Sequence, residues 1–327
     1  MRHAGDFGRP RLVPDEASRF PSHLIGSDDL PPRVVDEICR AAEDFETGKA
    51  RPSQWTGKSV ALLFFQPSTR TRMGFESATA ALGHQAVGAA DMQASRSNQR
   101  SGETLEDCAA VVSGLCDAIV VRHHETGAAE RMASVATCPV INAGDGFGEH
   151  PTQALIDVYS MRRGLGTLEG KSIAFCGDPR GRTVRSLVKL LRGERPEEVV
   201  FCPPDHLPVP KDLVTTLSAA GVAVRQVGDL AEILSASDAV MMAPYDMSDI
   251  GEPAASGYVS PRSTPDTHRL TPELLARTAS RTLVYHPLPR LDEIAPACDG
   301  LPNARYMQQV RLSRFVRMAI LNRWMPA

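Results

Sequence analysis

The sequence predicts an α/β protein built from two doubly wound parallel-sheet domains. Its 327 residues are too many for one compact core and suit two domains of roughly 150 residues each. In both halves, short apolar runs of strand length alternate with segments whose apolar residues recur every three or four positions. Strands that alternate with helices predict a parallel sheet with helices on both faces.

In the first half, a helix is expected after Pro31, because apolar residues recur at helical spacing until Gly48 and Pro52. Residues 60–65 form a continuous apolar run, typical of a buried strand, and a helix with one apolar face follows it. The polar stretch 91–102 is expected to be a loop. The remaining predicted elements are a helix from Glu103, strands at 118–121 and 140–141 with a helix between them, and a helix opened by Pro151 that bridges the domains.

In the second half, strands are expected at 172–176, 199–201, 222–224 and 239–242. Residues 243–269 are rich in Pro, Ser, Gly and Asp and are too long for an ordinary connection, so they are functional or disordered. The last helix carries an apolar face, with arginines expected elsewhere on its surface. The face comprises Leu312, Phe315, Val316, Ala319 and Ile320, and the arginines are Arg311, Arg314 and Arg317.

Composition excludes several classes of protein. A net charge of −3 with 23% charged residues leaves no basic field for nucleic acid. The seven scattered cysteines form no Cys-x-x-Cys pair, which indicates reduced thiols in a cytoplasmic protein and no zinc site. Residues 1–20 lack the apolar core of a signal peptide, and no apolar run is long enough to span a membrane.

The strongest chemical signal lies where the strand at 60–65 meets the next helix. Ser68, Thr69, Arg70 and Thr71 place hydroxyls, a guanidinium and unpaired backbone N–H groups at one helix N-terminus. Such a terminus binds phosphate. On this segment alone, the more ordinary interpretation is a capped helix with solvated arginines. The glycines of 177–183 do not follow the dinucleotide spacing, so nicotinamide binding is not expected.

The run Phe-x-x-Ser-Thr-Arg-Thr-Arg at residues 65–72 resembles the carbamoyl phosphate signature of the aspartate and ornithine carbamoyltransferases. Further segments resemble this family in its order from about His23 to the C-terminus, and more closely its aspartate-specific members. The resemblance implies a carbamoyl phosphate domain at 22–154, an acceptor domain at 155–305 and a C-terminal helix, 306–327, that packs back on the first domain. Residues 1–21 would be an extension.

The resemblance also implies roles for single residues. Arg70, Thr71, Arg122, His150 and Gln153 would be catalytic, and with Ser68, Thr69 and the Leu288 carbonyl they would bind carbamoyl phosphate. Arg182 would hold the α-carboxylate of the acceptor amino acid, beside Leu288 and Pro289. Neither a metal nor another cofactor is implied, because fixed cations and N–H donors would stabilise the developing charge. A homotrimer with shared active sites is implied, in which a loop bearing Ser97 and Arg100 reaches the neighbouring subunit.

Three positions depart from the family pattern. Ser101 stands where the family has a lysine; Arg96 or Arg100 could restore the cation from a neighbouring position, but arginine does not have the geometry of lysine, so full activity does not follow. Pro244-Tyr245-Asp246 replaces the Arg-x-Gln that grips the aspartate side chain, and Gln66 replaces an acidic residue. A carboxylate at 246 would repel aspartate and favour a cationic acceptor, such as a diaminopropionate-like amino acid.

Two alternatives stay open beside that hypothesis. Arg262 or Arg269 would restore ordinary aspartate chemistry if either side chain folded into the site. A catalytically silent homologue is the third interpretation, motivated by the lost lysine. The retained residues argue against it, because a silent subunit has no reason to keep a complete phosphate site.

Overall fold

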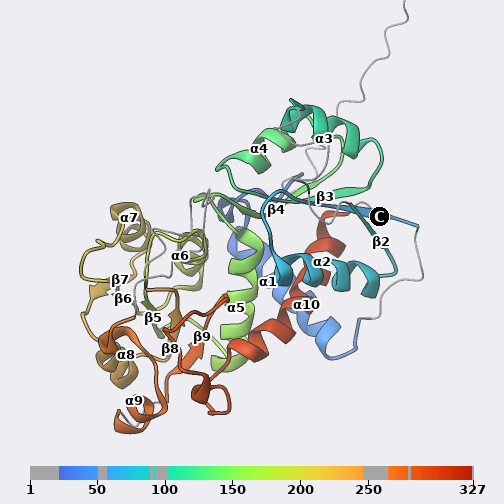
Figure 1. Ribbon diagram of the computed structural model, residues 1–327. Coiled ribbons are helices and arrows are strands. Elements are labelled where there is room, and N and C mark those ends of the chain that lie inside the picture. Colours follow the sequence, from blue (N-terminus) through green and yellow to red (C-terminus); the bar gives the residue numbers. More distant parts are fainter. Residues whose placement is uncertain are drawn as a thin grey trace, which may run out of the picture.

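Two parallel β-sheets, one in each half of the chain, carry the fold (Figure 1). The structure is a computed structural model that describes residues 22–50, 57–88, 92, 102–245, 264–278 and 281–325. The first sheet has the order β2-β1-β3-β4 and the second the order β7-β6-β5-β8-β9, and every pairing is parallel. The predicted fold class is confirmed.

The strands are β1 (Ser59–Phe64), β2 (Gln85–Val87), β3 (Ala118–His123), β4 (Val140–Asp145), β5 (Ser172–Cys176), β6 (Glu198–Cys202), β7 (Ala223–Gln226), β8 (Ala239–Met242) and β9 (Leu283–Tyr285). The helices are α1 (Pro32–Glu46), α2 (Thr69–Ala81), α3 (Leu105–Ser113), α4 (Ala128–Ala133), α5 (Pro151–Leu165), α6 (Arg182–Glu194), α7 (Lys211–Ala219), α8 (Leu230–Ala236), α9 (Pro272–Arg277) and α10 (Tyr306–Trp324), with a 3-10 turn η1 (Ser27–Asp29) before α1. The short strands β2 and β9 are not anticipated from the sequence, because three residues are too few to show a period.

Alternate side chains of each central strand enter different cores. In β1, Val60 and Leu62 join the core that contains α1, α2, α5 and α10, while Ala61 and Leu63 join the core beneath α3 and α4. The second sheet is likewise covered on both faces, by α6 and α7 on one side and by α8 and α9 on the other. Burial on both faces explains why the strands read as continuous apolar runs.

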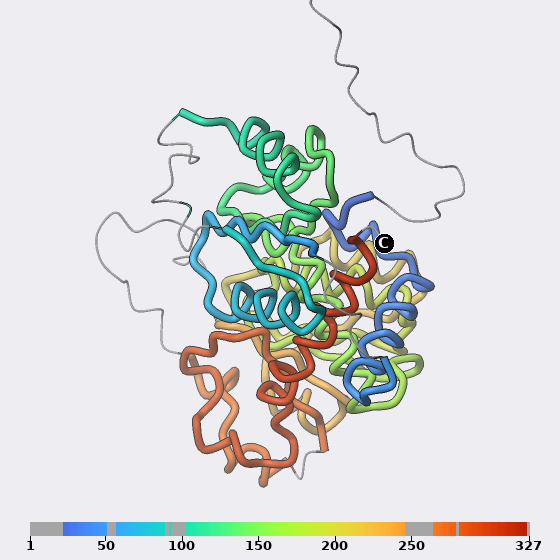
Figure 2. The backbone as a smooth tube through the Cα atoms, turned by 90° about the vertical axis from the view of Figure 1, so that its right-hand side faces the viewer, coloured from blue at the N-terminus to red at the C-terminus, as the bar shows by residue number. Residues whose placement is uncertain are grey.

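Helices α5 and α10 lie side by side between the two sheets (Figure 1). In the turned view, the red α10 runs next to the blue α1, and it also packs on α2 (Figure 2). One continuous core therefore joins the first domain to Ile173 and Phe175 of the second. Contrary to the sequence expectation, Arg317 of α10 is buried, with 3% of its surface exposed.

All seven cysteines are free thiols. Within the described ranges, no helix is long and apolar enough to span a membrane. The expected loops at 91–102 and 243–269 lie mostly outside the described residues.

Candidate active site

The N-terminus of α2 forms one wall of a cavity of about 850 Å³ between the two domains. Ser68 precedes the helix in an extended conformation, and its hydroxyl makes no capping hydrogen bond. The first intrahelical bond runs from Arg72 N to Ser68 O (3.4 Å), so the N–H groups of residues 69–71 precede the hydrogen-bonded turns. Ser68, Thr69, Arg70 and Thr71 all line the cavity. This is the geometry of a phosphate site.

Arg122 reaches the cavity from the end of β3, where the pairing with β4 is irregular. The register shifts between Val121 and His123, and within this bulge Arg122 Nη1 donates to Ala143 O (3.3 Å). Within the described residues, its Nε atom is buried without a hydrogen-bond partner. Burial, together with the nearby Arg182 and Arg70 charges, lowers the pKa of Arg122 to about 9. The guanidinium is thus held where a bound anion would stabilise it.

His150 and Gln153 begin α5 on the floor of the same cavity. The buried His150 ring has Nδ1 3.2 Å from the Thr152 hydroxyl, and burial holds its pKa well below the ordinary range, with Arg122, Arg182 and Arg317 adding to the effect. The imidazole is therefore neutral near pH 7. Gln153 Nε2 donates to Asp157 Oδ1 (2.7 Å), which leaves the Gln153 carbonyl oxygen as the free end of the amide.

Asp157 was not singled out in the sequence and lies one turn behind Gln153 on α5. Gln309 of α10 also donates to its Oδ1, over 2.6 Å. Burial raises the pKa of Asp157 to about 7, although the two amide hydrogen bonds oppose this rise. The available sequence signal was an aspartate among the apolar residues of a helix face, because a carboxyl group buried there needs a hydrogen-bond partner.

Arg182, the first residue of α6, crosses from the second domain to the first. Its Nη1 donates to Gly146 O (3.0 Å) and its Nη2 to Gln66 Oε1 (3.0 Å). Burial lowers its pKa to about 10. Gly144, with a φ of +114°, is where the two arginines converge, because a Cβ there would lie 3.1 Å from Arg182 Cζ and 3.2 Å from Arg122 Nη1. A side chain at position 144 would displace both guanidinium groups.

Leu288 and Pro289 also line the cavity and are joined by a cis peptide bond. Leu288 N donates to His286 Nδ1 (2.7 Å), so the proton of the neutral ring is on Nε2, which donates to Glu293 Oε1 (2.6 Å). Both buried side chains therefore fix the turn that presents the Leu288 carbonyl.

The cavity wall is strongly cationic. Of its charged side chains in the described part of the chain, one is a carboxylate, Asp178, and it pairs with Arg180 (2.7 Å). The arginines are Arg70, Arg122, Arg182, Arg311, Arg314 and Arg317. The last three lie on α10, and their spacing of three residues was the available signal for a shared helix face.

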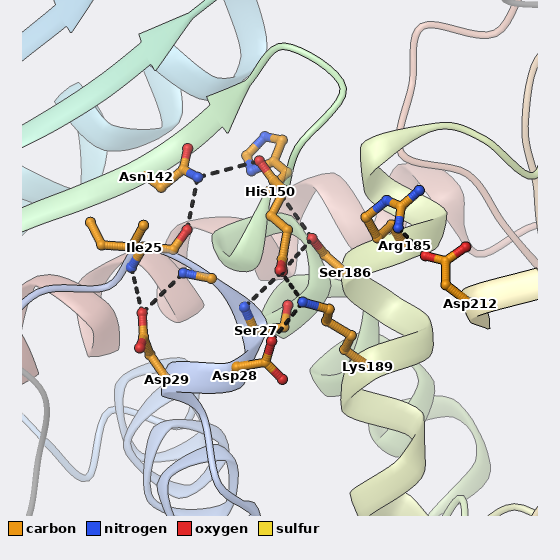
Figure 3. A network of polar contacts seen from close by, with 12 residues as sticks. Ile25, Ser27, Asp28, Asp29, Asn142, His150, Arg185, Ser186, Lys189 and Asp212 are labelled. Carbon is orange, nitrogen blue, oxygen red and sulfur yellow. Dashed lines mark hydrogen bonds and ion pairs between the residues drawn. The ribbon is translucent and has the colours of Figure 1, made fainter. Parts of the chain in front are cut away.

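A network of polar contacts supports His150 from behind (Figure 3). His150 N donates to Ser186 Oγ (2.9 Å), and Glu149 accepts from Ser186 Oγ (3.2 Å), from Ser27 N (2.7 Å) and from Lys189 Nζ (2.5 Å). Lys189 also contacts Asp28 (2.6 Å). One residue of α6 therefore ties the second domain to η1 and to the start of α5.

The structure brings together the predicted residues 68–71, 122, 150, 153, 182, 288 and 289 around one cavity. Three predicted site residues, Ser97, Arg100 and Asp246, lie outside the described residues, as do Arg96, Ser101 and Arg262. Pro244 lines the cavity, whereas Arg269 does not.

Two family models match successive parts of the chain. Residues 22–163 match the aspartate/ornithine carbamoyltransferase, carbamoyl-P binding domain, and residues 169–323 match the Asp/Orn binding domain. The aspartate carbamoyltransferase catalytic subunit of Archaeoglobus fulgidus is 39% identical over 304 residues, which are 92% of this chain and 98% of the relative. The chloroplastic aspartate carbamoyltransferase of Arabidopsis thaliana is 39% identical over 289 residues, 88% of this chain and 73% of the relative.

Solved structures of aspartate transcarbamoylases are similar to this chain in fold and in sequence. The catalytic subunit of M. jannaschii aspartate transcarbamoylase has a TM-score of 0.82 and 34% identity, covering 93% of this chain and 98% of that one. Aspartate transcarbamoylase from Trypanosoma cruzi, in complex with carbamoyl phosphate and aspartate, has a TM-score of 0.78 and 30% identity. The match covers 93% of this chain and 96% of that one.

Proposed function

The chain belongs to the aspartate/ornithine carbamoyltransferase family and is a carbamoyltransferase, and we propose that it moves the carbamoyl group of carbamoyl phosphate onto the amino group of aspartate. One observation carries this proposal. A phosphate-type helix N-terminus, two half-buried arginines and a neutral histidine line a single cavity between the domains. Such a cavity holds two anionic substrates side by side.

In the proposed reaction, the uncharged amine of the acceptor attacks the carbamoyl carbon. Negative charge develops on the carbonyl oxygen, beside Thr71, Arg122 and His150, and the C–O bond to phosphate breaks. The phosphate leaves within Ser68, Thr69, Arg70 and Thr71 and takes the amine proton. In the tautomer of neutral His150 whose Nδ1 accepts from the Thr152 hydroxyl, Nε2–H is the donor to the oxyanion. Gln153 would bind the carbamoyl amino group through its free carbonyl oxygen.

The electrostatics of the wall favour an acceptor with two carboxylates. Arg182 would take the α-carboxylate, and the arginines of α10 leave positive charge for a second anionic group. A cationic acceptor, such as a diaminopropionate-like amino acid, would meet like charge. The carboxylate that motivates that alternative, Asp246, lies outside the described residues. Aspartate, the acceptor in the names of the relatives, is therefore the substrate we propose.

The proposed assembly is a homotrimer with shared active sites. The loop with Ser97 and Arg100 would complete each site from the neighbouring subunit. The proposal rests on family membership. Sedimentation of the purified protein tests it, because a homotrimer should have three times the mass of one chain.

The test of function is phosphate release from carbamoyl phosphate by the purified full chain, with aspartate, ornithine and diaminopropionate compared at equal concentrations. We expect turnover with aspartate and formation of carbamoyl aspartate. Turnover with diaminopropionate alone would overturn the proposed acceptor and restore the Asp246 hypothesis. No turnover with any acceptor would favour the silent homologue. Arg70→Gln is the matched negative variant, because it keeps a polar side chain at the phosphate site without the cation.

A further inference from the structure

Helix α10 presents a row of arginines to the cavity, at positions 311, 314 and 317. Residues three apart on a helix lie on one face and rise about 4.5 Å per step. Arg317 is buried against α2, where its guanidinium lies 5.4 Å from the centre of the Phe75 ring, whereas Arg314 and Arg311 are exposed on the preceding turns. The row therefore leads from the interior of the cavity toward solvent.

These charges are poorly matched by the protein itself. Arg317 Nη1 donates to Ser313 Oγ (2.6 Å), and burial lowers its pKa to about 10. Across the described ranges, neither Arg311 nor Arg314 forms an ion pair, and Arg317 contacts no carboxylate. Like charges at this spacing on a helix repel one another. Positive groups arranged in this way gain stability when an anion binds between them.

The other cations of the cavity already have assigned anions. In the proposed reaction, Arg70 and Arg122 serve carbamoyl phosphate and Arg182 serves the α-carboxylate. In the described wall around Pro244, Leu288 and Pro289, the charged side chain is the Asp178 carboxylate, which pairs with Arg180 and supplies no cation for an anionic group. A second carboxylate on the acceptor therefore has one set of cations left in the described part of the cavity, on α10.

We propose that Arg314 and Arg311 bind the side-chain carboxylate of the acceptor. The inference rests on the proposed function and adds the residues that select a dicarboxylate. Arg314 is the central contact, since it lies between buried Arg317 and exposed Arg311 on the row. Arg317 holds the row against α2, because a Cβ at Gly74 would lie 2.5 Å from its Nη1.

The experiment compares the wild-type chain with Arg314→Gln and Arg311→Gln. A hydrogen bond to a charged group predicts that Arg314→Gln raises the KM for aspartate roughly tenfold to a hundredfold. The KM for carbamoyl phosphate should change less than about twofold. Preference for aspartate over asparagine should fall by a similar factor, because asparagine lacks the carboxylate. Arg314→Lys should recover part of this preference, and Arg277→Gln, an exposed arginine on α9 outside the cavity, is the control.

A second measurement separates this inference from the proposed function. Succinate, a dicarboxylate without an amine, is titrated into each variant in the presence of carbamoyl phosphate. Weaker succinate binding in Arg314→Gln supports the inference even if aspartate is not carbamoylated. Unchanged aspartate KM or unchanged succinate affinity overturns it while leaving carbamoyl transfer intact, and so does a rise in the carbamoyl phosphate KM alone. Absence of both aspartate turnover and succinate binding in the wild type overturns both.

Discussion

Arg182 of the second domain donates from Nη2 to Oε1 of Gln66 in the first domain, over 3.0 Å. Its other terminal nitrogen donates to Gly146 O, so the guanidinium is held by first-domain atoms at the start of a second-domain helix. Gln66 is neutral, which leaves the charge of Arg182 uncompensated by this partner. That charge is therefore available to the acceptor.

Gln66→Glu is expected to weaken acceptor binding. A carboxylate at this distance would pair with Arg182 and compete with the α-carboxylate of the acceptor for it. If this competition costs on the order of 1 kcal/mol, the KM for the acceptor rises roughly fivefold. Gln66→Met removes the hydrogen bond without adding charge and is the matched control. Steady-state kinetics with varied acceptor measure the effect. A lower KM for the acceptor in Gln66→Glu would contradict this expectation. It would show that a stronger contact between the two domains helps acceptor binding more than an unpaired Arg182 charge does.

Arg122→Met should stabilise the ligand-free protein and abolish most activity. Burial lowers the pKa of Arg122 to about 9, which means that folding disfavours its charged form. Removing that charge should raise the free energy of unfolding by about 1 kcal/mol, whereas losing an oxyanion donor should lower kcat roughly a hundredfold or more. Thermal unfolding without phosphate measures the gain in stability, and steady-state kinetics measure the loss of kcat. Thermal unfolding with phosphate checks anion binding, since phosphate should stabilise the wild type more than the variant. A variant less stable than the ligand-free wild type contradicts this account.

Asp157→Asn should change how stability depends on pH. The pKa of Asp157 is raised to about 7 in the folded protein, against about 3.9 when unfolded. The folded state therefore binds the proton more tightly, and the free energy of unfolding falls as pH rises from about 4 to about 7. Asparagine does not titrate but still accepts from Gln153 and Gln309.

The free energy of unfolding of Asp157→Asn should therefore depend less on pH than that of the wild type. At pH 8 it should be higher than the wild-type value by on the order of 2–4 kcal/mol. Urea unfolding at several pH values measures this difference. Equal slopes for the two proteins between pH 4 and 7 would contradict the assigned pKa.

Lys189→Met should weaken the tie between the domains. It leaves the Glu149 carboxylate, whose side chain is 14% exposed, without its cation, at a cost of about 1–3 kcal/mol. A several-fold lower kcat is also expected, because Glu149 and Ser186 together support His150. Arg192→Met is the control, since Arg192 pairs with Asp28, whose side chain is 58% exposed, and should cost under about 1 kcal/mol. Equal losses in the two variants would remove the special role given to Lys189.

Much of this architecture could be predicted before any coordinates. The strand at 172–176 was predicted with its exact bounds, and those at 60–65 and 118–121 to within about two residues, because strands buried on both faces leave continuous apolar runs. Strands β2 and β9 were missed, since three residues carry no period. Helix α10 was foreseen as amphipathic, but the burial of Arg317 was not, because periodicity separates apolar faces and does not show where a charged side chain reaches another helix.

By itself, the sequence determined the parallel α/β class, the two-domain organisation and the phosphate-type turn at Ser68–Thr71, because these depend on local patterning and on residues adjacent in the chain. Only the tertiary structure decided that Arg122 and Arg182 meet at Gly144, that Asp157 is buried between two glutamines, and that arginines of the last helix line the cavity. Apart from the Gln153–Asp157 hydrogen bond, these relationships join residues tens to hundreds of positions apart. Their distances, and the pKa shifts that follow from burial, are set by how the two sheets and α10 pack together.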